Sequence, residues 1–151
     1  MALRWFIPVM VLLLSACGAE PEPPEARLRA TIADAEHAIE ARALKTAAGF
    51  VAPEYRDSEG RDARSVRQSL LGYLQRHRNI HLLTRIADLQ LSEDGSAAQV
   101  RLYVAMAGVP IESYQALLSV RADHHRFDLT FVDGKQGWRL TAAEWQRAAL
   151  D

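Results

Sequence analysis

The chain has 151 residues, of which 49% are hydrophobic and 25% charged, and its formal net charge is −1 at pH 7. This balance argues against a protein that binds nucleic acid, because such proteins carry a clustered basic face. The chain has one cysteine, so no internal disulfide can form and hydrophobic burial must stabilise the fold.

The first 16 residues have the pattern of a signal peptide. Arg4 precedes an apolar run from Trp5 to Leu14 that is interrupted by Pro8. A membrane-spanning helix needs about 20 apolar residues, whereas the core of a signal peptide needs about 7–15. We therefore predict that residues 1–16 are a signal peptide and take no part in the fold.

The stretch Leu14-Ser15-Ala16-Cys17 closes this apolar run. It resembles the lipobox of bacterial lipoproteins, in which the cysteine is acylated and becomes the mature N-terminus. The resemblance implies lipidation of Cys17 and attachment to a lipid bilayer, since two or more acyl chains anchor stably. The alternative is an ordinary secretory signal with an incidental cysteine. Gly18 stands where aspartate favours inner-membrane retention in enterobacteria, which implies the outer membrane, facing the periplasm.

Residues 17–26 are expected to form a tether. The stretch from Gly18 to Glu25 reads Gly-Ala-Glu-Pro-Glu-Pro-Pro-Glu. Its prolines favour an extended chain of about 3.1 Å per residue, and its glutamates repel one another. The tether would hold one domain, residues 27–151, away from the bilayer.

Two helices are predicted next. Apolar residues recur at helical spacing from Ala26, and Gly49 is expected to end the first helix, on whose solvated face Glu36 and Glu40 lie. A short turn and loop containing Tyr55 follows. Asp62 is expected to cap the second helix. The buried stripe of that helix consists of Val66, Leu70, Tyr73 and Leu74.

After Asn79 the hydrophobic period changes to two, which predicts an antiparallel meander. The first strand is expected over 80–91, with a bulge near 84–86 where the apolar parity switches. The next strand begins near Ala98, a long one covers about 117–132, and the last covers 138–145. A regular last strand would place Trp138 and Trp145 on opposite faces, with Trp138 part-exposed beside the preceding turn.

This order of elements closes in Gly137-Trp138-Arg139-Leu140-Thr141-Ala142-Ala143-Glu144-Trp145 and resembles the nuclear transport factor 2-like superfamily. The resemblance covers roughly residues 27–147. It implies an α+β fold with N-terminal helices packed on a curved antiparallel sheet of about four strands, around a conical cavity. That superfamily includes ketosteroid isomerase, scytalone dehydratase and many non-catalytic binding domains, so the fold alone does not assign a function.

The candidate site lies in the segment 121–131. Phe127, Leu129 and Phe131 share one parity, and three large apolar side chains at alternate positions must be buried. In an unbroken strand, Arg121, Asp123 and His125 share that inward parity. These three residues and Tyr55 are the pocket candidates.

A bulge at His124–His125 is the alternative, and it is the arrangement we expect. Val120 and Ala122 have the opposite parity, and a single slip would turn them inward and the charged residues outward. On that reading Asp123 and His125 are ordinary surface residues.

No metal site or cofactor is predicted. His124 and His125 are adjacent and would point to opposite faces of a strand, and His37, His77 and His81 lack the spacing of a tetrahedral set. Asp88 could pair with Asp123 as acid and base, but its parity indicates that it faces solvent.

The function that these features favour is a membrane-anchored, non-catalytic periplasmic domain that binds a small apolar ligand or an envelope protein. The alternative is an isomerase- or dehydratase-type enzyme with Asp123 and His125 as catalytic residues. Homodimerisation through the exposed face of the sheet is a third candidate role.

We predict that Cys17 carries acyl chains that hold the protein in a membrane. Growth with a palmitate analogue should label the wild type, which should fractionate with membranes. Cys17→Ala removes the only thiol, so this variant should lose both the label and the membrane association. An unlabelled wild type that fractionates with soluble proteins would contradict the lipobox interpretation.

Overall fold

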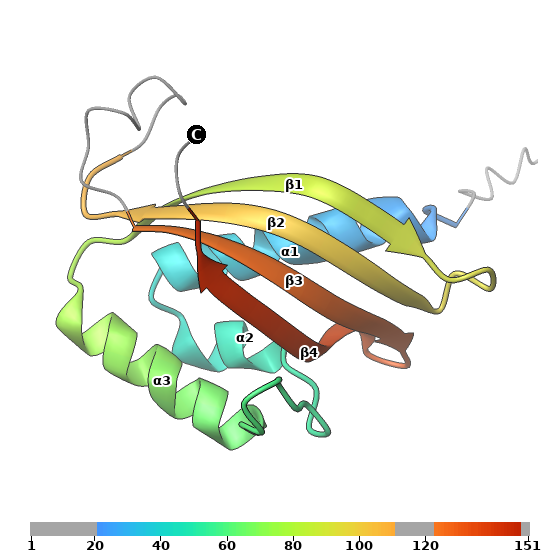
Figure 1. The fold of residues 1–151 in the computed structure, drawn as a ribbon, viewed down its shortest axis with the longest axis horizontal. Coiled ribbons are helices and arrows are strands. Elements are labelled where there is room, and N and C mark those ends of the chain that lie inside the picture. Colours follow the sequence, from blue (N-terminus) through green and yellow to red (C-terminus); the bar gives the residue numbers. More distant parts are fainter. Residues whose placement is uncertain (1–20, 111–122, 149–151) are drawn as a thin grey trace, which may run out of the picture.

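The computed structural model describes residues 21–110 and 123–148, which form helices packed on one face of a curved sheet (Figure 1). The helices are α1 (Pro24–Glu40), α2 (Leu44–Gly49) and α3 (Ala63–Arg76). The strands are β1 (His81–Leu91), β2 (Ala97–Ala107), β3 (Asp123–Gly134) and β4 (Gly137–Arg147). They pair antiparallel in the order β1-β2-β3-β4. The predicted α+β fold class is therefore confirmed. No helix in the described ranges has the length and apolar character to cross a membrane.

The first helix ends earlier than predicted. α1 stops at Glu40, Arg42 adopts a left-handed backbone with φ of 59°, and α2 then begins. The Arg42 guanidinium donates to the backbone carbonyls of His77 and Arg78 beyond the end of α3. A contact between residues so distant in sequence leaves no trace in the local hydrophobic period, which continues through this break.

The start of α3 is as predicted. Asp62 occupies the N-cap, and its carboxylate accepts a hydrogen bond of 2.8 Å from the Ser65 amide. This bond satisfies one of the amide groups that the first helical turn leaves without an intrahelical partner.

Two bulges shape the sheet. In β1 the register shifts between Ile86 and Asp88, so a bulge is present but lies slightly later than predicted. The second bulge was not predicted: Thr130 pairs with Ala142 and Phe131 with Leu140, which leaves Thr141 unpaired. Such an extra residue reverses the inward parity of everything after it and bends the strand.

The bulge at Thr141 corrects the prediction for the tryptophans. Trp138 belongs to the hydrophobic core and is 2% exposed, whereas Trp145 is 39% exposed. Because the parity changes between them, Trp145 also faces the concave side of the sheet and lines a cavity there. The expectation that Trp138 is part-exposed and that the two rings point to opposite faces is therefore wrong.

One end of the sheet is fastened to the start of α1. The Trp138 indole donates to the Pro24 carbonyl at 3.2 Å, and Arg27 forms an ion pair of 2.6 Å with Asp133. Gly95 in the β1–β2 turn has φ of +69°, and a Cβ there would lie 3.3 Å from Pro24 Cγ. α1 and both hairpin turns thus close this end of the fold.

We predict that Trp138 contributes far more to stability than Trp145. Trp138→Ala should lower the free energy of unfolding by about 3–5 kcal/mol, because it leaves a cavity in the core. Trp145→Ala removes a partly exposed ring and should cost about 1–2 kcal/mol. Chemical denaturation measures both values. Equal losses in the two variants would contradict the register of β4.

Candidate functional site

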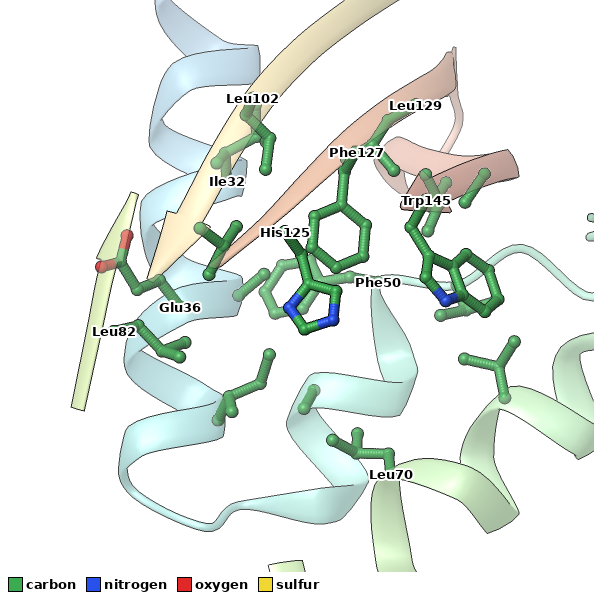
Figure 2. Close-up of a pocket in the computed structure, with 18 of the residues that line it drawn as sticks. Ile32, Glu36, Phe50, Leu70, Leu82, Leu102, His125, Phe127, Leu129 and Trp145 are labelled. Atoms are coloured by element: carbon green, nitrogen blue, oxygen red, sulfur yellow. The ribbon is translucent and has the colours of Figure 1, made fainter. Parts of the chain in front are cut away.

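A cavity of about 560 Å³ lies between the concave face of the sheet and the helices. Most of its lining is apolar, and every helix and strand contributes to it. Figure 2 shows Ile32, Phe50, Leu70, Leu82, Leu102, Phe127 and Leu129 around it. Three of the lining residues that the structure describes are exposed, Ser69, Arg76 and Trp145, and we call these the rim.

β3 runs through the candidate segment without a bulge. Each residue from Asp123 to Val132 pairs in turn with β2, from Met106 to Ala97. The expected bulge at His124–His125 is therefore wrong, and His125 lines the cavity together with Phe127, Leu129 and Phe131.

The reason is visible in β2. Ala105 and Ala107 have the parity opposite to that of Val104 and Met106, which line the cavity, yet they are only 5% and 8% exposed. At this end of the sheet, small apolar residues are buried on the outer face as well. Apolar residues of both parities therefore require no slip in register.

His125 is directed into the cavity (Figure 2). Its ring centroid lies 6.1 Å from that of Phe127, and its Nδ1 atom is buried without a hydrogen-bond partner among the described residues. A neutral imidazole protonated on Nε2 leaves only a lone pair unsatisfied at Nδ1, which costs less than a buried N–H without an acceptor. We therefore assign this tautomer, in which the ring offers one donor.

Tyr55, the other pocket candidate that the structure describes in full, also lines the cavity and is 1% exposed. Burial raises the pKa of its phenol to about 12, and the nearby Asp57 carboxylate adds to this shift. The phenol therefore stays protonated at neutral pH and is a hydrogen-bond donor.

Asp57 and Arg61 brace the loop before α3. Burial opposes ionisation of Asp57, but the amides of Arg61 and Glu59 and the Arg61 guanidinium together hold the pKa of this carboxyl below its usual range. The same guanidinium lies 3.1 Å from a Glu59 carboxylate oxygen and 4.1 Å from the centroid of the Trp145 ring. Two carboxylates therefore face the Arg61 guanidinium, although its Nη2 atom is buried without a hydrogen-bond partner among the described residues.

Glu36 lines the cavity beside β1 and is half-buried, so its predicted place on a solvated face is wrong. Burial is the largest influence on its carboxyl and raises the pKa, against a hydrogen bond with the Thr84 side chain that lowers it. The sequence analysis missed Glu36, Arg61 and Trp145 as lining residues. Their sequence neighbourhoods carry no signal for a cavity, because they meet only in the folded chain.

The remaining candidates are not brought together. Asp123 opens β3 opposite Met106, and Arg121 and Cys17 lie outside the described residues. Asp88 is exposed and accepts a hydrogen bond of 2.9 Å from Gln90. Within the described ranges, no three His, Cys, Asp or Glu side chains gather as metal ligands.

Comparison with solved structures identifies the fold. The chain is similar to a proposed dehydratase of the NTF2-like family from Streptomyces avermitilis (TM-score 0.64, 12% identity, 87% of this chain and 100% of that one). It is also similar to a Nostoc punctiforme domain of unknown function with a cystatin-like fold (TM-score 0.65, 10% identity, 87% and 81%).

Bdellovibrio bacteriovorus Bd1075 is similar at a TM-score of 0.62 and 10% identity; the match covers 83% of this chain but only 41% of that longer one. No protein-family model and no curated protein matches the sequence. These likenesses establish the cystatin-like, nuclear transport factor 2-like α+β cone fold.

We predict that the imidazole of His125 does not stabilise the folded chain. Since its Nδ1 has no described partner, His125→Phe should leave the free energy of unfolding unchanged or raise it by up to about 1 kcal/mol. The exposed His37 serves as the control, and His37→Phe should stay within about 0.5 kcal/mol of the wild type. Denaturant titration gives both values. A loss above about 1 kcal/mol for His125→Phe would mean that the imidazole has a partner in the folded chain.

Proposed function

We propose that this chain is a non-catalytic binding domain that takes a small, largely apolar molecule into its cone. The observation that carries the proposal is the cavity of about 560 Å³ with a mainly apolar lining. Pockets that bind small molecules have volumes of about 300–1,000 Å³ and combine apolar walls with few polar groups. The cavity has the size and the chemistry of such a pocket.

The cavity is not an ordinary packing defect. Protein interiors pack at a density of about 0.74, and voids larger than a water molecule are few. The cost of a void increases by about 24 cal/mol per Å³, so a chain under selection for stability alone would fill it. The large rings of Phe50, Phe127 and Trp145 instead stand around an open volume.

The polar lining residues define what the ligand must offer. His125 and Tyr55 are both donors in the states assigned above, whereas the Glu36 carboxyl is half-buried and burial raises its pKa. A ligand that brings an oxygen into the cavity can accept a hydrogen bond from the Tyr55 hydroxyl or from Nε2 of His125, which a pure hydrocarbon cannot do.

We further propose that the domain acts at the cell envelope, attached through Cys17 at the outer membrane and facing the periplasm. The lipobox resemblance and the Pro/Glu-rich sequence from Gly18 to Glu25 support this location. α1 begins at Pro24, inside the predicted tether 17–26, so the helical domain starts earlier in the chain than predicted. An envelope protein, or a second copy of the chain on the outer face of the sheet, stays a predicted partner.

A dehydratase- or isomerase-type enzyme is the second candidate. His125 within an apolar cavity favours it, because an imidazole in such surroundings can act as a general base, and one similar structure is a proposed dehydratase. Asp123, the other predicted catalytic residue, lies two positions earlier on β3. Turnover of a hydroxylated carbonyl compound that His125→Phe abolishes would favour the enzyme over the binding domain.

We predict that a bulky residue at the rim blocks ligand entry. N-phenyl-1-naphthylamine, an uncharged dye that fluoresces in apolar sites, should bind the wild type with saturation at one site. Ser69→Trp should weaken this binding at least about tenfold, or about 1.4 kcal/mol.

Gln68→Trp is the matched control, because Gln68 is an exposed neighbour on α3 that does not line the cavity. It should bind the dye as the wild type does. If the wild type does not bind the dye, or both variants bind it unchanged, the cavity is not the binding site.

A further inference from the structure

We propose, on the basis of the binding function above, that the cavity selects an amphiphile with an apolar chain and a carboxylate headgroup, and that Arg76 binds this carboxylate at the rim. The charge that the ligand must carry follows from which charged groups around the cavity are already paired.

The described carboxylates near the cavity are engaged within the protein or half-buried. Asp57 and Glu59 face the Arg61 guanidinium. Glu36 is half-buried, and Glu40 accepts a bond of 2.7 Å from the Leu82 amide. None of the rim residues that the structure describes is acidic, so the rim offers no described carboxylate to a cationic ligand.

Arg76 is the cation without such a partner. It is exposed yet lines the cavity, and no hydrogen bond or ion pair engages its guanidinium in the part of the chain that the structure describes. Arg61, the other cation in the lining, forms ion pairs with Asp57 and Glu59. Arg76 is therefore the charged residue among the rim residues that the structure describes.

Gly72 helps to place the Arg76 side chain. A Cβ at Gly72 would lie 3.4 Å from one terminal nitrogen of Arg76 and 3.9 Å from the other. The guanidinium therefore lies back along α3, over the previous turn, as long helical side chains do. A glycine at this turn leaves room for it beside the cavity. A planar guanidinium in this position can hold a carboxylate with two parallel hydrogen bonds.

The donors inside the cavity fit the same ligand class. His125 and Tyr55 offer hydrogen atoms to an acceptor, and the apolar walls accommodate a hydrocarbon chain. A carboxylate with an aliphatic chain meets the positive rim and the apolar interior together. A neutral chain satisfies only the interior, and a cationic amphiphile is repelled at Arg76.

The test compares three ligands with the same twelve-carbon chain: dodecanoate, methyl dodecanoate and dodecyltrimethylammonium. Each displaces N-phenyl-1-naphthylamine from the mature-length chain, residues 17–151 with Cys17→Ser, below its critical micelle concentration. We expect dodecanoate to bind at least about tenfold more tightly than the ester, and the cation most weakly. The advantage of dodecanoate should decrease as salt rises, because the rim is exposed.

Arg76→Gln and Arg78→Gln provide matched variants. Both remove one positive charge near the end of α3, but Arg78 does not line the cavity. Arg76→Gln should lower dodecanoate affinity about tenfold, to the level of the ester, and leave ester affinity within about twofold. Arg78→Gln should change neither. Both variants should melt at the wild-type temperature without ligand.

Two outcomes would overturn the proposal: equal binding of ester and carboxylate, or equal loss of dodecanoate affinity in the two arginine variants. If the uncharged dye still binds in either case and Ser69→Trp still blocks it, the binding function stands and only the ligand class is wrong. If neither the dye nor any of the three amphiphiles binds, the binding function fails as well.

Discussion

The structure depends on the fastening of α1 to one end of the sheet. The buried Trp138 ring packs in the same core cluster as Leu28 and Ile32, and its indole donates to the carbonyl of Pro24. The ion pair of Arg27 with Asp133 adds a second attachment at the same end. Here the two layers are in full contact, and the apolar burial that stabilises a chain without disulfides is concentrated.

The cavity lies beyond the part of α1 that is attached to the sheet. The lining residues of α1 extend from Thr31 to Ile39, beyond its closely packed first turns. α3 packs on α2, and it stands away from the strands in Figure 1. Side chains of α3 and of the four strands line the cavity of about 560 Å³. The bulge at Thr141 completes the wall, because it turns Trp145 to the concave side, where Arg61 covers its ring.

Much of the fold could be predicted from sequence because it follows from short-range patterns. The alternation in β2 and the Asp62 cap are local, and both reappear in the structure. The break at Arg42 and the bulge at Thr141 were not predictable in this way. The first depends on carbonyls beyond the end of α3, and the second on the pairing of β4 with β3.

For the candidate site as well, short-range patterns predicted some features and missed others. The parity of Phe127, Leu129 and Phe131 offered an inward position for His125, but the apolar residues of opposite parity favoured a slip, and the expected outward position of His125 was wrong because β3 has no such slip. Arg76 and Glu36 could not be recognised, since a charged residue on a helix usually faces solvent. Only the folded arrangement shows which of these charges has a partner.

The position of the chain's entry into the domain has a consequence for how a ligand is exchanged. α1 starts at the closed end, and its rise of about 1.5 Å per residue places Ile39 roughly 20 Å further from that end. If Cys17 is embedded in a bilayer and the tether is extended, the open end of the cone points into the aqueous space. Such a protein would exchange its cargo with partners across that space, not with the lipids around its own anchor. The same geometry makes the N-terminus the suitable point for coupling the protein to a sensor surface, because attachment there leaves the rim accessible.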